Sequence, residues 1–185
     1  LNAAGDILWS QDFVDGSVKD VHPESGVRVL VLTKQDTTPY HILRFLPDGT
    51  PDGDVAFQST TRCIFVGSDG SSGFVVAGNF PVDPNNDKPA FLKIDSAGAV
   101  TGEVHLTGFL AANIANVCEL PGGGYAMIGL GFSTQYSGIR GHVLKASADF
   151  TQEWVKALPD QFQGKRVFLS PDGQLLAAGW GMQDY

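Results

Sequence analysis

The sequence predicts an all-β protein built from small antiparallel sheets that repeat along the chain. Three observations support this. Apolar segments framed by glycine recur at a nearly constant spacing, 23 glycines and 10 prolines punctuate the 185 residues, and only 17% of the residues are charged. Glycine and proline favour turns and weaken helices, so many short strands are expected.

Each apolar segment follows a glycine at an equivalent position. Gly26, Gly73, Gly124 and Gly173 precede VRVLVL, FVVAG, YAMIG and QLLAAG, in steps of 47, 51 and 49 residues. The apolar residues of these segments do not alternate with polar ones, which predicts strands buried on both faces. A period of about 49 residues is typical of stacked supersecondary units that cannot bury their faces alone.

Two further features keep the same period. HILRF, AFLKI and HVLKA carry Leu43, Leu92 and Leu144, and polar turns then lead into alternating strands such as EWVKAL at 153–158. Each repeat is therefore interpreted as four short antiparallel strands, which is the structure of a β-propeller blade. The nearest thing to a helical stretch is the alanine-containing segment 109–117.

The repeats divide the chain into successive blades. The pieces are the outer strand of a preceding blade, three complete blades, and the inner strands of a further blade: residues 1–13, 14–58, 59–108, 109–158 and 159–185. Two arrangements are open, a closed four-bladed ring or part of a ring of about seven or eight blades. The partial ring is favoured, because a four-bladed ring would leave a strand edge open near Tyr185.

Several segments resemble repeats of bacterial surface and secreted β-propellers, including lipoproteins of the Bacteroidota. The similarity rests on SGFVVAG at 72–78, FLKIDSAG at 91–98 and NAAGDILW at 2–9, and the pattern covers nearly the whole chain. One departure is Phe150, which stands where a turn glycine is expected. The resemblance implies a scaffold or binding protein outside the cytoplasm, at the cell surface, secreted or periplasmic.

Charge and hydropathy limit the classes of partner that the chain is expected to bind. With 12 basic and 20 acidic side chains the formal net charge is −8, which disfavours nucleic acid and anionic membrane surfaces. The sequence shows no apolar run of about 18 residues, so no membrane span is predicted. Residues 1–5 lack a leader pattern and an initiator Met, and we expect any address signal upstream. A protein partner or surface complex is expected, with a glycan as the alternative.

Loops on one face of the blades are long and uneven: residues 33–40, 79–89 and 130–141. Such loops on a rigid frame are a usual place for recognition. The predicted ligand-binding residues are aromatic and lie in or near these loops: Phe80, Phe132, Tyr136 and Trp180. Packing between blades is the other interpretation of Phe80, Phe132 and Trp180.

Side chains with oxygen donors at alternate positions suggest a metal-binding site. In NFPVDPNNDKP, Asp83, Asn85 and Asp87 have the spacing that begins many calcium loops. Lys88 replaces the expected glycine and no glutamate closes the loop, so a solvated turn is the alternative and no cofactor is otherwise predicted. Asp83 and Asp87 also define the alternative function, a carbohydrate-active propeller that is lectin-like or hydrolytic. Enzymatic activity stays open, with a binding role favoured.

The histidines and cysteines add little evidence for a functional site. His41 and His142 occupy matching positions of their repeats. The equivalent position in the repeat 59–108 is Ala90, so a ring of metal ligands would lack one member. Cys63 and Cys118 fall on predicted first strands of neighbouring blades. A disulfide and two buried thiols are both open interpretations.

Overall fold

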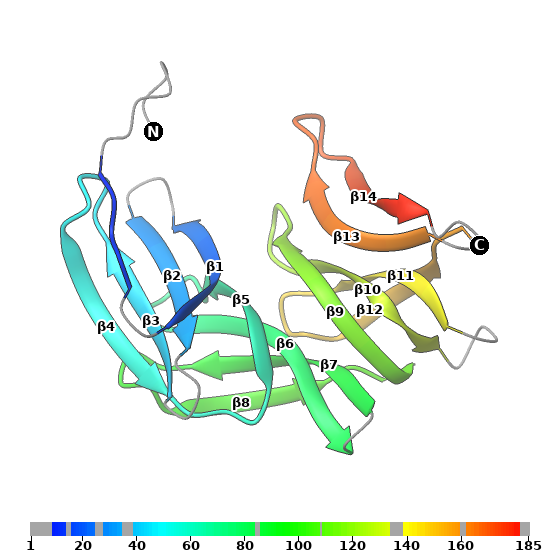
Figure 1. The fold of residues 1–185 in the computed structure, drawn as a ribbon, viewed down its shortest axis with the longest axis horizontal. Coiled ribbons are helices and arrows are strands. Elements are labelled where there is room, and N and C mark those ends of the chain that lie inside the picture. The colour runs from blue at the N-terminus through cyan, green and yellow to red at the C-terminus, as the bar shows by residue number, and fades with distance from the viewer. Residues whose placement is uncertain are drawn as a thin grey trace. The chain divides into compact units, whose positions relative to one another are not determined.

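The computed structural model describes residues 9–13, 16–24, 28–34, 39–83, 86–107, 109–133, 139–159 and 162–181. These residues form fourteen strands, and no helix occurs among them (Figure 1). The strands make three four-stranded sheets and one two-stranded sheet. The predicted all-β class, with four-stranded antiparallel sheets, is confirmed.

Each sheet is formed by strands that follow one another along the chain. The first sheet contains β1 (Ser17–Glu24), β2 (Arg28–Lys34), β3 (Tyr40–Phe45) and β4 (Pro51–Phe57). The second contains β5 (Arg62–Ser68), β6 (Phe74–Asp83), β7 (Asn86–Ile94) and β8 (Val100–His105). The third contains β9 (Phe109–Glu119), β10 (Tyr125–Ser133), β11 (Ile139–Ala146) and β12 (Gln152–Ala157). The fourth contains β13 (Phe162–Leu169) and β14 (Leu175–Gly181).

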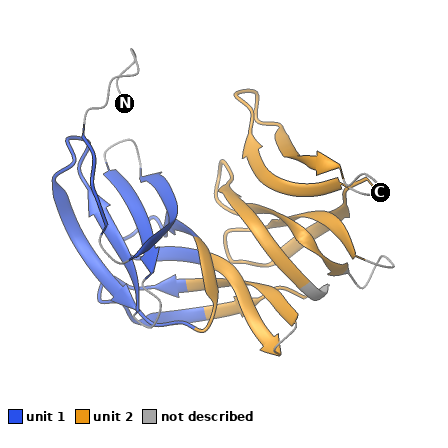
Figure 2. Cartoon of the chain, viewed as in Figure 1, with its two compact units in different colours: residues 1–59, 65–76, 93–102 blue, residues 60–64, 77–92, 103–185 orange. Residues whose placement is uncertain are grey.

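The chain divides into two compact units (Figure 2). The first comprises residues 1–59, 65–76 and 93–102, and the second comprises residues 60–64, 77–92 and 103–185. The first sheet lies in the first unit, and the third and fourth sheets lie in the second. Strands of the second sheet contribute residues to both units.

The second strand of each four-stranded sheet supplies much of the core. Phe74 to Ala77 of β6 and Ala126 to Ile128 of β10 are all buried. This confirms the expectation of burial on both faces for the segments in β2, β6 and β10, whereas the fourth such segment, in β14, is largely exposed. In the second unit, β13 packs against β9, β10 and β11, and its Val167 joins a buried cluster with Ile128 and Val143.

The turn between β9 and β10 needs its glycines. Gly122, Gly123 and Gly124 have φ angles of 82°, 88° and 94°, in the left-handed region that glycine adopts readily. A Cβ atom at Gly124 would also lie 2.7 Å from the carbonyl oxygen of Ala146. The glycine run therefore forms this turn for conformational and steric reasons.

Asparagine side chains tie neighbouring sheets of the second unit together. Asn79 Nδ2 donates to the Ile114 carbonyl oxygen at 3.1 Å, and Asn79 Oδ1 accepts from the Ile114 N–H at 2.6 Å. Asn116 Oδ1 accepts from the Val167 N–H at 2.9 Å. These bonds satisfy backbone groups that would otherwise be costly to bury.

Two expectations about local structure are wrong. The candidate helix at 109–117 is part of β9, because pairing with β10 along its length outweighs the helix propensity of its alanines. The expected loops 79–89 and 130–141 are mostly strand, since β6 runs to Asp83, β7 begins at Asn86, β10 runs to Ser133 and β11 begins at Ile139. Strand residues of two β-hairpins, β6–β7 and β10–β11, therefore stand where open loops were expected.

No helix in the described part of the chain is long and apolar enough to cross a membrane.

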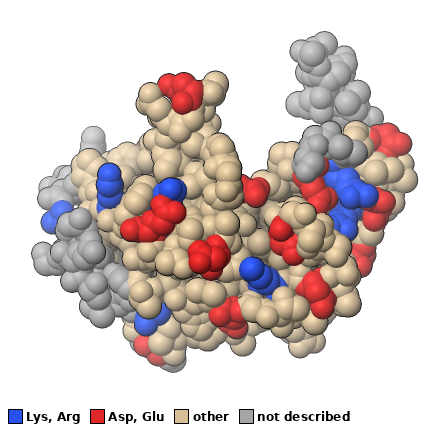
Figure 3. Space-filling view, turned by 180° about the vertical axis from the view of Figure 1, so that it is seen from behind, with Lys and Arg blue, Asp and Glu red and all other residues tan. Residues whose placement is uncertain are grey.

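Charged side chains of both signs are distributed over the face shown in Figure 3, where small groups of acidic side chains have basic side chains among them. Some pair directly, as Lys145 does with Glu153 at 2.7 Å and Arg28 with Asp52 at 2.6 Å.

Candidate binding site

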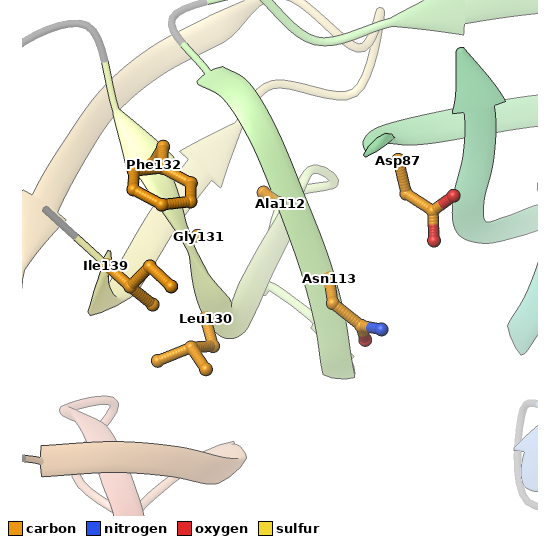
Figure 4. Close-up of a pocket in the computed structure, with 7 residues that line it drawn as sticks. All are labelled: Asp87, Ala112, Asn113, Leu130, Gly131, Phe132 and Ile139. Atoms are coloured by element: carbon orange, nitrogen blue, oxygen red, sulfur yellow. The ribbon is translucent and has the colours of Figure 1, made fainter. Parts of the chain in front are cut away.

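A pocket of about 200 Å³ lies beside the β10–β11 hairpin (Figure 4). Residues from β7, β9, β10 and β11 line it: Asp87, Ala112, Asn113, Leu130, Gly131, Phe132 and Ile139. In the view of Figure 4, the polar Asp87 and Asn113 side chains lie on one side of β9, and the apolar side chains of Leu130, Phe132 and Ile139 lie on the other. The pocket therefore has a polar and an apolar end.

The apolar end is formed by the last pair of the β10–β11 ladder. Phe132 lies directly opposite Ile139, and the two are 40% and 54% exposed. An aromatic and a β-branched side chain in this relation form a favourable cross-strand pair. Both still leave apolar surface in water, which a binding partner would cover favourably.

At the polar end, Asp87 is held in an ion pair with Arg62, which is not itself among the residues that line the pocket. Both carboxylate oxygens of Asp87 accept hydrogen bonds from the guanidinium of Arg62. The Asp87 side chain is 11% exposed, whereas the Arg62 side chain is 63% exposed. A ligand at this end therefore meets a carboxylate whose charge is already compensated, with the cationic partner more accessible than the anion.

The structure separates the four predicted aromatic residues. Phe132 lines the pocket, while Phe80 stacks on His105 with 4.0 Å between ring centroids. Trp180 is exposed, with Lys165 Nζ 4.5 Å from its ring centroid. Tyr136 lies outside the described residues. Phe132 thus lines the same pocket as Asp87, a residue predicted for a different role, and neither Phe80 nor Trp180 lines it.

The predicted calcium ligands have protein partners. Asp83 Oδ2 accepts a hydrogen bond from Asn86 Nδ2 at 2.7 Å, and Asp87 is paired with Arg62. Asn85 lies outside the described residues. Within the ranges that the structure describes, no three His, Cys, Asp or Glu side chains gather in a way that would hold a metal ion. Calcium binding stays a prediction from the sequence.

The thiols and the buried imidazole lie elsewhere. Cys63 and Cys118 are free cysteines, and burial raises the pKa of the Cys118 thiol, which disfavours the reactive thiolate at neutral pH. Burial lowers the pKa of His142, so its imidazole is neutral at physiological pH. None of the three lines the pocket.

Sequence reasoning missed Asn113, Leu130 and Ile139 as pocket residues. Asn113 lies in segment 109–117, which was only the nearest thing to a helical stretch in the sequence, and the structure places it in β9 opposite Leu130. Ile139, the first residue of β11, lies inside the expected loop 130–141, and only the ladder shows that it faces Phe132.

Comparisons with known proteins bear on the fold. No protein-family model matches the chain, and no curated protein does so either. A crystal structure of a protein of unknown function from Bacteroides caccae is similar, with a TM-score of 0.55 and 15% sequence identity. The match covers 95% of this chain but 58% of that one. At this identity the likeness concerns the fold alone.

Proposed function

We propose that the chain is part of a β-propeller and acts as a non-catalytic binding module. Three of its sheets have four strands in sequence order, and the segments that form them recur about every 49 residues. Propellers arrange such sheets as blades around an axis. In this proposal the four sheets are consecutive blades of a partial ring of about seven or eight blades.

The exposed pair Phe132 and Ile139 carries the binding proposal. Aromatic and aliphatic side chains held on a rigid hairpin are typical anchors of protein interfaces. The pocket beside them, at about 200 Å³, is smaller than the roughly 300–1,000 Å³ usual for small-molecule sites. Its size suits a single side chain of a protein partner.

A glycan is the second candidate ligand. Phe132, Asp87 and Asn113 line one pocket, so a flat apolar ring and hydrogen-bonding groups are available to the same ligand. Hydrolysis by the usual pair of carboxylates needs two of them across the substrate. Asp87 is the one carboxylate among the described lining residues, so we propose no hydrolytic role.

The proposed location is outside the cytoplasm, as part of a surface complex or bound to a secreted partner. This part of the proposal depends on the resemblance of the repeats to bacterial surface and secreted propellers. The net charge of −8 is compatible with a partner that presents basic groups around an apolar anchor.

Site-specific photo-crosslinking tests the proposal. A crosslinking amino acid at Ile139, in the cells that make the protein, is expected to trap one partner protein. The same residue at Val104, which is exposed on β8, serves as the control and should trap none. Phe132→Ser should abolish the Ile139 product. Equal products from both positions would contradict the proposal.

A glycan array at low and millimolar calcium tests the second candidate. The protein-partner proposal expects no binding under either condition. Glycan binding that Phe132→Ser removes would establish the lectin-like function instead, and binding seen only with calcium would support the predicted metal loop.

A further inference from the structure

A cation with unused hydrogen-bond donors stands next to the polar end of the pocket. Arg62, the first residue of β5, uses Nη2 for both of its bonds to the Asp87 carboxylate. Its guanidinium has no other hydrogen bond or ion pair among the described residues. A guanidinium carries five N–H donors, so Nε and Nη1 of Arg62 keep three of them.

Arg62 is also the accessible member of its ion pair. Its side chain is 63% exposed, whereas that of Asp87 is 11% exposed. Asp87 lines the pocket, which places the Arg62 guanidinium within hydrogen-bond distance of a lining side chain. Arg62 and all the lining residues belong to the second compact unit. A ligand that extends past Asp87 therefore meets a positive group first.

Charges around the pocket have the opposite balance from the chain as a whole. Segments 79–89 and 130–141, in which the two hairpins turn, contain four charged residues: Asp83, Asp87, Lys88 and Arg140. With Arg62 these make three basic and two acidic side chains, a balance of +1 in a chain of net charge −8. Charge complementarity at this place therefore favours an acidic group on the partner.

We propose that the pocket binds a protein segment that carries an apolar residue and, two positions away, an aspartate or glutamate. This inference rests on the binding role proposed for the pocket and names the chemistry of the partner. The apolar side chain would contact Phe132 and Ile139. The carboxylate would accept hydrogen bonds from Nε and Nη1 of Arg62, and bonds between two ionised groups are stronger than neutral ones.

The spacing of the two partner residues follows from the two ends of the pocket. The polar and the apolar side chains lie on opposite sides of β9 (Figure 4), so two partner residues are needed to reach both. In an extended segment, residues i and i+2 point to the same side and lie about 6.6–7 Å apart. This exceeds the roughly 4.8 Å between neighbouring strands, so the two side chains can reach either side of β9.

Matched peptides test the proposal. The probes are acetyl-Leu-Gly-Glu-amide and its neutral counterpart acetyl-Leu-Gly-Gln-amide, each also in the reversed order, because an extended segment can lie in either direction. NMR titrations follow the Arg62 Nε–H and the Ile139 methyl groups. In at least one order, the Glu peptide should bind about two- to five-fold more tightly than the Gln peptide at low ionic strength. Salt at about 0.5 M should remove most of this preference.

Protein variants identify the group that reads the charge. The double variant Arg62→Gln with Asp87→Asn removes the guanidinium without leaving a carboxylate unpaired, and it should bind both peptides equally. Asp87→Asn alone leaves the charge of Arg62 uncompensated, so its preference for the Glu peptide should rise by at least about two-fold. Arg166→Gln is the control, because Arg166 is exposed on β13 and does not line the pocket.

Circular dichroism shows whether each variant keeps its sheets. If the double variant does not fold, the comparison of Glu and Gln peptides on the unmodified protein, with its salt dependence, still decides the question. Equal affinity for the two peptides in both orders would overturn the inference, as would no binding of any peptide. A Glu preference that the double variant retains would assign the charge reading to another residue and would also overturn it.

Failure of this inference is distinguishable from failure of the binding role of the pocket. Equal binding of the Glu and Gln peptides that Phe132→Ser weakens would overturn the acidic partner and leave the apolar anchor site intact. The opposite result is a Glu preference that persists in Phe132→Ser and with alanine in place of the peptide's leucine. That result would overturn the apolar anchor, and with it the inference that depends on it.

Discussion

The side chain of Asp20 accepts a hydrogen bond from the backbone N–H of Val66, with 3.0 Å between Oδ2 and N. Asp20 follows a bulge in β1, and Val66 is fully buried in β5. Asn116 makes the same kind of bond with Val167, again next to a bulge. A side chain beside a bulge thus satisfies a buried backbone donor in the first strand of the following sheet.

Replacing this acceptor should destabilise the protein. Asp20→Ala leaves the Val66 N–H buried without its acceptor, which is expected to lower the free energy of unfolding by about 1–3 kcal/mol. Urea unfolding followed by circular dichroism measures the change. Asp20→Asn is the matched control, because the amide oxygen of Asn116 accepts the equivalent hydrogen bond from a backbone N–H. Equal losses for both variants would show that the hydrogen bond is not the cause.

Phe150 combines backbone strain with aromatic packing. Its φ is 68°, in the left-handed region, while its ring stacks on Phe91 at 4.6 Å between centroids and lies near Tyr125. Phe150→Ala should cost about 3–5 kcal/mol of unfolding free energy, because it removes the packing and keeps the strain. Phe150→Gly should cost about 1 kcal/mol less, since glycine adopts this φ freely. Thermal and urea unfolding compare the two, and a more stable alanine variant would contradict the strain argument.

Gly129 is required for close contact between strands. A Cβ atom there would lie 2.2 Å from the carbonyl oxygen of Asn113, which is backbone and cannot rotate away. Gly129→Ala should therefore lower the unfolding free energy by at least about 1–3 kcal/mol. A Cβ at Gly181 meets nothing within 4 Å, so Gly181→Ala should change stability by less than about 0.5 kcal/mol. A tolerated Gly129→Ala in urea unfolding would mean that β9 and β10 separate at little cost.

His142 should make stability depend on pH. Burial, with a smaller contribution from the charge of Arg140, holds its pKa below the ordinary 6.5. The unfolded chain therefore takes up a proton near pH 6.5 that the folded chain does not, so stability is full above 6.5 and falls as the pH drops through 6.5 towards the lower folded pKa. The loss is at most about 1.4 kcal/mol per pH unit.

Melting temperatures at about pH 7.5 and about pH 5.5 measure this effect. His142→Gln should show a smaller decrease on acidification than the unmodified protein. His41→Gln is the control, because His41 stands at the matching position of β3 but is only half-buried and paired with Asp54. An unchanged pH dependence in His142→Gln would exclude His142 as the source.

The repeats predicted more of the fold than of the site. The frame around FVVAG and YAMIG, with a glycine on each side, predicted inner strands, and these are buried as expected. The aromatic residues after those strands looked alike in sequence, yet Phe80 is covered by His105 and Phe132 is exposed beside Ile139. Sequence spacing does not reveal how far a hairpin extends, and this extension decides which side chain stays in solvent.

The amino-acid sequence by itself determined the class of structure. Turn glycines, uninterrupted apolar segments and a recurring period are local properties, and strand formation follows from them with little dependence on distant residues. The three-dimensional structure alone decided that segment 109–117 is a strand, that Asp87 pairs with Arg62, and that Asn113 and Ile139 share a pocket. These outcomes depend on cross-strand register and on contacts between residues far apart in the chain, whose energies outweigh local propensity only once the sheets have formed.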